Sequence, residues 1–86
     1  MVITRQVVAG KIAAHLQSRL PLRDLVDWAE SALMEGEFSE KDASVLSPIV
    51  ARLGVADVRT FGLTWEDCEQ LLRQLGYTAR VEVVPA

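Results

Sequence analysis

The sequence predicts a mostly α-helical fold, in which a compact bundle of four main helices is followed by a C-terminal β-strand. In four segments, apolar residues recur at three- and four-residue spacing, as they do in amphipathic helices. Proline and glycine separate these segments, and both residues commonly mark helix ends. The last segment, 77–84, instead alternates between two faces, which is typical of a strand.

The first helix is expected to begin after Thr4, which suits the N-cap position, and to run to about Leu20. Its apolar stripe is narrow, with Val8, Ile12 and Leu16 at four-residue spacing. Pro21 should end this helix, because proline has no amide hydrogen and its ring clashes with the preceding turn.

The second helix is predicted over residues 22–35, with Pro21 in or before its first turn. Asp24 and Asp27 fall near its start, where the helix dipole favours negative charge. Gly36 is a suitable C-terminal stop. One broad apolar face runs along this segment, and Trp28 borders it.

The third helix should follow residues 39–42, whose sequence Ser-Glu-Lys-Asp resembles a capping box, and should end at Gly54. Pro48 lies inside its apolar stripe. The sequence permits two outcomes: a kink at Pro48, or a split in which Ser47 caps a new helix.

Residues 55–62 fit either one helical turn closed by Gly62 or a short strand. The fourth helix has clearer signals. Thr64 and Asp67 have capping-box spacing, and Gly76 is expected to adopt a left-handed conformation that lets Tyr77 fold back near Leu72.

The segment after Gly76 is predicted to be a strand ended by Pro85. A strand exposes unpaired backbone donors and acceptors, so we expect this one to pair with a short segment of the same chain, with a second subunit or with another protein. Trp28 joins the interface candidates because aromatic residues often anchor interfaces, although it also suits the edge of the core. The candidate interface residues are Tyr77, Ala79, Arg80, Val81, Glu82, Val83 and Trp28.

Length and composition predict a single domain over residues 1–86. Half of the residues are hydrophobic. So small a domain cannot easily bury that many apolar side chains, which favours an interface with another molecule. Charge is uneven: residues 1–23 hold four basic and no acidic residues, whereas residues 24–42 hold seven acidic residues and one basic residue. Either the two segments neutralise each other, or the acidic one meets a basic partner.

No catalytic or ligand-binding motif is recognisable. The one cysteine and one histidine are too few for a structural zinc site, and Cys68 lies on an apolar face, where burial suppresses thiol reactivity. The acidic balance opposes nucleic-acid binding, and no segment approaches the length of a membrane helix. We therefore expect a cytoplasmic, non-enzymatic protein with no cofactor, metal or small-molecule ligand.

Two functions fit these observations. The first is a protein-interaction module that forms a homodimer through its C-terminal strand. The second is an acidic inhibitor of the immunity-protein or antitoxin type, which shields a basic partner protein; this hypothesis depends on size and charge alone.

Overall fold

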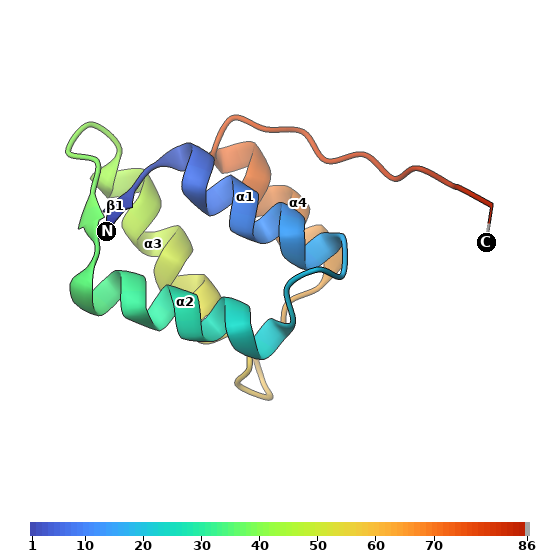
Figure 1. Ribbon diagram of the computed structural model, residues 1–86, viewed down its shortest axis with the longest axis horizontal. Helices are drawn as coiled ribbons and strands as arrows, with labels where there is room; N and C mark the ends of the chain where they lie inside the picture. The colour runs from blue at the N-terminus through green and yellow to red at the C-terminus, as the bar shows by residue number, and fades with distance from the viewer. Residues whose placement is uncertain (86) are drawn as a thin grey trace.

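Within residues 1–85, which the computed structural model describes, the chain forms four helices and two very short strands (Figure 1). The expected mostly α-helical fold with four main helices is confirmed. The elements in chain order are β1 (Val2–Ile3), α1 (Arg5–Leu16), α2 (Leu22–Glu35), β2 (Glu37–Phe38), α3 (Ala43–Gly54) and α4 (Trp65–Gln74).

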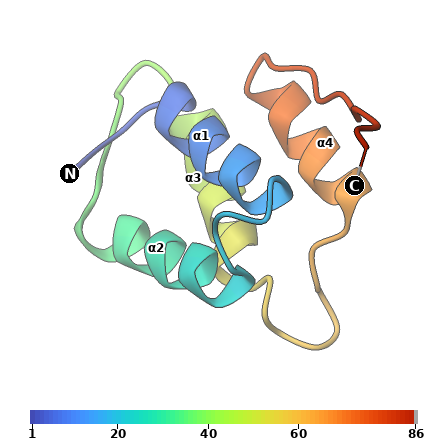
Figure 2. The same ribbon diagram turned by 45° about the vertical axis from the view of Figure 1, so that its right-hand side comes forward.

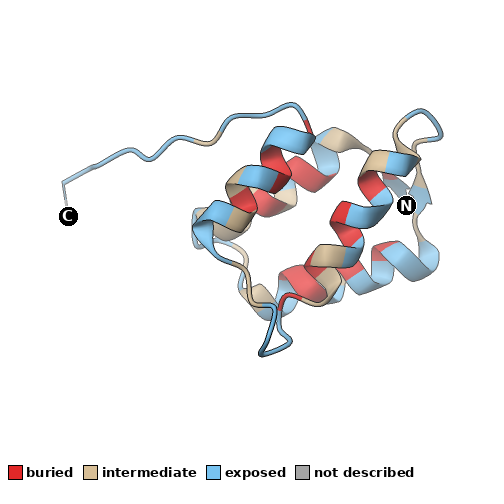
Figure 3. Cartoon of the chain, turned by 180° about the vertical axis from the view of Figure 1, so that it is seen from behind, coloured by how far each residue is buried: buried red, intermediate tan, exposed pale blue. Residues whose placement is uncertain are grey.

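The core lies where the four helices turn their apolar faces toward one another (Figure 3). Helix α2 packs along α3, and α4 packs beside α1 on the other side of the bundle (Figure 2). Burying one aliphatic side chain completely contributes roughly 1.5–3 kcal/mol, so these faces drive the fold. The largest fully buried side chains are Ile3, Ile12, Leu25, Leu46, Ile49, Leu53 and Leu75.

The strand pairing was not predicted. β1 and β2 pair in parallel, with Val2 opposite Glu37 and Ile3 opposite Phe38. Ile3 is buried beside Gly36, where an added Cβ would lie 2.9 Å from the Ile3 Cγ1 atom and 2.5 Å from the Ala32 oxygen. Only glycine therefore lets the chain turn so tightly from α2 into β2.

Helices α1 and α4 begin as their sequences indicate. The Thr4 side chain accepts a hydrogen bond from the Val7 amide at the start of α1. At the start of α4, Thr64 and Asp67 form a reciprocal capping box. These contacts satisfy amides that have no partner within a helix.

Helix α3 differs from its prediction at its start. It begins at Ala43, and its N-cap residue Asp42 makes no side-chain capping bond. The Asp42 carboxylate instead accepts a hydrogen bond of 3.0 Å from Arg5 Nε, so the expected capping box does not form. The helix runs through Pro48 without a break, which excludes a split there.

Residues 55–62 form hydrogen-bonded turns, so the helical-turn alternative is correct and the short strand is not. The amides of Phe61 and Gly62 both donate to the Val58 oxygen. Gly62 has a φ of 61°, in the left-handed region that glycine adopts without strain.

The C-terminal segment after Gly76 is extended but lies in no hydrogen-bonded strand, so a single copy does not form the β-strand expected at 77–84. It runs away from the bundle and gives the molecule its 42 Å long axis (Figure 1). Among the described residues, none pairs with this segment as a second strand, so pairing within one chain, one of the expected alternatives, does not occur. Pairing with a second subunit stays a prediction.

Candidate protein-interaction surface

Six of the predicted interface residues lie together in the extended segment 77–85, here called the tail. The end of α4 positions this tail: the Gly76 amide donates to the Arg73 oxygen, and the Tyr77 amide donates to the Leu72 oxygen. With Gly76 at a φ of 92°, these two bonds form a Schellman motif, which fixes the direction in which the chain leaves the helix.

Beyond that anchor, most of the tail is exposed. Ala79 packs against the edge of the core, whereas Val81 is 70% exposed and Val83 is 96% exposed. Ala79, Val81 and Val83 share the predicted apolar face of the strand. That face therefore begins on the body of the protein and continues past it with nothing packed against it.

A groove of about 810 Å³ lies between the tail, α1 and α4. Helix α1 runs along one wall and tail residues 77–82 along the other, while Trp65 and Leu72 belong to α4. The α1 wall is built from small and polar side chains, namely Gln6, Ala9, Gly10, Ala13 and Gln17, together with Leu16. A second pocket, of about 320 Å³, lies between α3 and α4. The groove is the larger of the two, so a bound segment would find more contact there.

The α1 wall is open at Gly10. A Cβ added to Gly10 would have no neighbouring atom within 4 Å, so no packing within this chain requires glycine at that position. Glycine inside a helix costs roughly 0.5–1 kcal/mol relative to alanine. The gap above Gly10 leaves room for an incoming side chain to approach the α1 backbone closely.

The two tryptophans have different surroundings. Trp28 is half-buried against the core, with Lys11 Nζ 5.6 Å from its ring centroid, and it does not line the groove. Trp65, which is not among the predicted interface residues, is 38% exposed and lines the groove. Its place one residue after the Thr64 cap was the only sequence signal for this role.

A second candidate surface is acidic. Asp24, Asp27 and Glu30 are exposed on α2, and Glu35 and Glu37 follow them near β2. Of the acidic residues between 24 and 42, only Asp42 takes part in one of the ion pairs found among residues 1–85, with Arg5. The basic and acidic segments thus meet at one ion pair, and the exposed carboxylates of α2 face solvent.

The side chains that could act as catalytic groups or metal ligands do not form one cluster within residues 1–85. Cys68 is buried in the core, and burial raises the pKa of its thiol, which disfavours the reactive thiolate. His15 Nδ1 lies 2.9 Å from the Leu20 oxygen. Within the described residues, no group of three or more His, Cys, Asp or Glu side chains could hold a metal ion, and no helix is long and apolar enough to cross a membrane.

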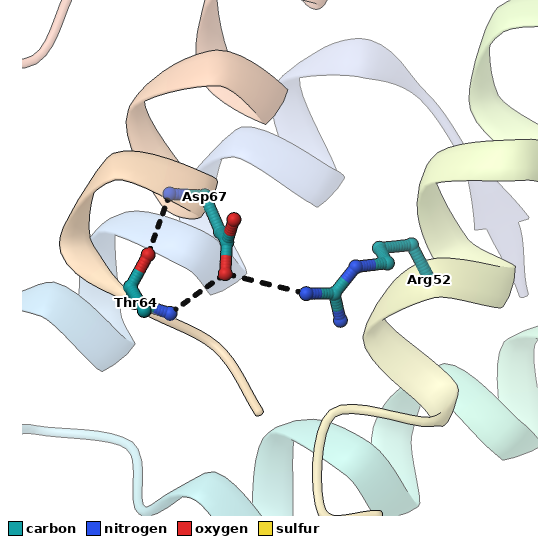
Figure 4. A network of polar contacts seen from close by, with 3 residues as sticks. All are labelled: Arg52, Thr64 and Asp67. Atoms are coloured by element: carbon teal, nitrogen blue, oxygen red, sulfur yellow. Dashed lines mark hydrogen bonds and ion pairs between the residues drawn. The ribbon is translucent and has the colours of Figure 1, made fainter. Parts of the chain in front are cut away.

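The contact between α3 and α4 is polar at one point (Figure 4). Asp67 Oδ2 accepts a hydrogen bond of 2.9 Å from the Thr64 amide and one of 3.3 Å from Arg52 Nη2. The bond from the Thr64 amide, with a smaller contribution from the Arg52 charge, lowers the pKa of the Asp67 carboxyl. Since all three residues hold the start of α4 against α3, we assign this cluster a structural role.

The chain was compared with models of protein families, with curated proteins and with solved structures. None of the three comparisons found a match. Function therefore has to be inferred from the chain's own surfaces.

Proposed function

We propose that this protein is a non-enzymatic protein-interaction module that forms a homodimer by pairing the tails of two copies. One observation carries the proposal: the tail is extended and exposed, and its apolar side chains Val81, Val83 and Val84 contact little of their own chain. β-Branched residues of this kind favour strands. The single buried cysteine is consistent with a reducing, cytoplasmic setting.

The driving force for pairing comes from side chains rather than from the backbone. Because the tail is exposed, water can hydrogen-bond to its amide and carbonyl groups, so a lone tail incurs no cost for unpaired backbone. Burying the exposed valines, by contrast, lowers the free energy and so favours pairing. The unpaired backbone therefore does not require a partner. The reason to expect one is the exposed apolar face of the tail.

The tail sequence is complementary to itself in one antiparallel register. If two tails cross a two-fold axis at Val81, Arg80 of one copy lies opposite Glu82 of the partner subunit, and the reverse pair forms symmetrically. Opposite charges directly across a pair of strands contribute roughly 0.2–1 kcal/mol each, and like charges there are destabilising. This register also aligns the apolar faces of both tails.

Multi-angle light scattering of the purified chain tests the proposal, with a mass of twice 9.5 kDa expected. The variant Arg80→Glu should shift the mass toward the monomer, because carboxylates would then face each other. The double variant Arg80→Glu/Glu82→Arg should restore the dimer, because it exchanges the two charges. A monomer at tens of micromolar in the unmodified protein would refute the proposal.

The acidic α2 surface supports a second candidate function, an inhibitor that covers a basic protein. The exposed carboxylates of Asp24, Asp27 and Glu30 lie along one helix without ion-pair partners among residues 1–85. Such an arrangement attracts a positively charged surface and speeds association. The exposed negative charge of α2 is the one observation that favours this second candidate.

Co-purification from the native cells separates the two functions. If the inhibitor function is correct, a specific basic protein should be captured in moderate salt and lost when Asp24, Asp27 and Glu30 are changed to Asn, Asn and Gln. The variant Arg80→Glu, which leaves α2 unchanged, is the matched control and should retain the partner. Capture that disappears at moderate salt for every variant would contradict this function.

A further inference from the structure

The groove between the tail and α1 is matched in length to one extended segment. From Gln6 to Gln17, helix α1 spans roughly 16 Å at its usual rise per residue. From Tyr77 to Glu82, an extended tail spans roughly 16 Å as well. Both ranges line the groove, so a second strand placed alongside the tail would lie over α1 for the whole length of the groove.

The proposed register determines which side chains would enter the groove. With the two-fold axis at Val81, Ala79 lies opposite the partner's Val83, and directly opposed residues of a strand pair point to the same face. Ala79 already faces the protein body, since it packs against the edge of the core. The partner's Val83 would therefore face the body beside it.

A two-stranded ribbon alone is only marginally stable in water, and it needs a packed face to persist. The Val83 side chain has no such packing in one copy, where it is 96% exposed. The α1 wall offers the missing surface, because the space above Gly10 is empty.

We propose that each copy's tail docks in the groove of the other copy, so that the partner's Val83 covers Gly10 and Ala13 of α1. This inference rests on the proposed homodimer and adds the binding site to it. The occupant is a second copy rather than another protein, because Arg80 and Glu82 complement their own antiparallel image. Arg80 and Glu82 then lie on the opposite face of the ribbon from Val83.

Disulfide trapping between different chains tests the docking site directly. All chains carry Cys68→Ala, so that the only thiols are those introduced. A chain with Gly10→Cys is mixed with a chain with Val83→Cys under mild oxidation, and a cross-linked species of twice the chain mass is expected. The matched control replaces Gly10→Cys with Ala51→Cys, an exposed α3 position outside the groove, and should give no cross-link.

A separate variant keeps the inference distinguishable from the proposed function. Val81→Cys alone should cross-link to its own copy, because two residues on the two-fold axis of an antiparallel pair lie within disulfide reach. If Val81→Cys links but positions 10 and 83 do not, the tails pair outside the groove and the inference is overturned. If neither links and the mass is that of a monomer, the homodimer itself is refuted.

One further outcome would also overturn the inference. A single chain carrying both Gly10→Cys and Val83→Cys could form an internal cross-link at monomer mass. If that link forms and the mixed single-cysteine chains stay unlinked, the tail closes over its own groove and a second copy does not occupy it.

Discussion

The Tyr77 amide donates a hydrogen bond of 2.9 Å to the carbonyl oxygen of Leu72. This bond reaches back over the last turn of α4 and sets the point at which regular helix becomes extended tail. Leu72 is buried and lines the groove, while Tyr77 begins the opposite wall. One backbone contact thus connects the packing of the bundle with the surface proposed to bind a second copy.

Alanine substitutions at two glycines should change stability in opposite directions. Gly76→Ala should lower the free energy of unfolding by about 1 kcal/mol, because a residue with a Cβ is strained at a φ of 92°. In the monomeric Arg80→Glu background, where no second copy covers α1, Gly10→Ala should raise it by about 0.5–1 kcal/mol, because Gly10 is helical and a Cβ there meets open space. Urea denaturation measures both, and equal effects at the two positions would contradict this account.

Acid should weaken the start of α4. The pKa of Asp67 is lowered from its ordinary value of 3.8, first by the hydrogen bond from the Thr64 amide. A lowered folded-state pKa means that the ionised carboxylate stabilises the fold above about pH 4 and that this contribution is lost as pH falls through the lowered value. Asp67→Asn should therefore flatten the decline in the urea midpoint below pH 4. An unchanged decline in that variant would contradict this prediction.

Truncating the buried face of α4 should be costly. Leu72 is 5% exposed in the core, so Leu72→Ala should lower the free energy of unfolding by about 2–5 kcal/mol. Leu33→Ala is the matched control, because Leu33 is 41% exposed on α2 and should lose much less. Chemical denaturation compares the two, and a loss under about 1 kcal/mol for Leu72→Ala would mean that the α4 face is not packed.

Cys68 should be protected from alkylation in the folded protein. Its thiol is buried and burial raises its pKa, so little thiolate is available to react near pH 8. Mass spectrometry after iodoacetamide treatment should show slow labelling in buffer and rapid labelling in concentrated urea. Equally fast labelling in both solutions would show that the first turn of α4 opens readily.

The sequence predicted best where neighbouring residues determine the structure. The capping box of Thr64 and Asp67 and the left-handed Gly76 are local features, and both are present. The burial of Leu71, Leu72 and Leu75 also follows from helical spacing. Four helices were predictable because each has its own apolar stripe, but α1 ends at Leu16 instead of near Leu20 and α3 begins without its predicted capping box.

Features that depend on distant residues were missed or mistaken. The capping box at 39–42 failed because Asp42 pairs with Arg5, far away in the sequence. β1 and β2 are two residues each, too short for any alternation to be visible. The groove was missed because its walls come from opposite ends of the chain, and sequence patterns do not show which distant segments lie side by side.

The pairing of β1 with β2 has a consequence for the order in which the chain folds during synthesis. Val2 leaves the ribosome before its partner Glu37, which emerges only after the whole of α2. Joining distant segments carries an entropic cost that an already formed helix reduces by shortening the connection. We therefore expect β1 to stay unpaired until α2 has formed. Ile3 would then pack into that end of the core late in folding.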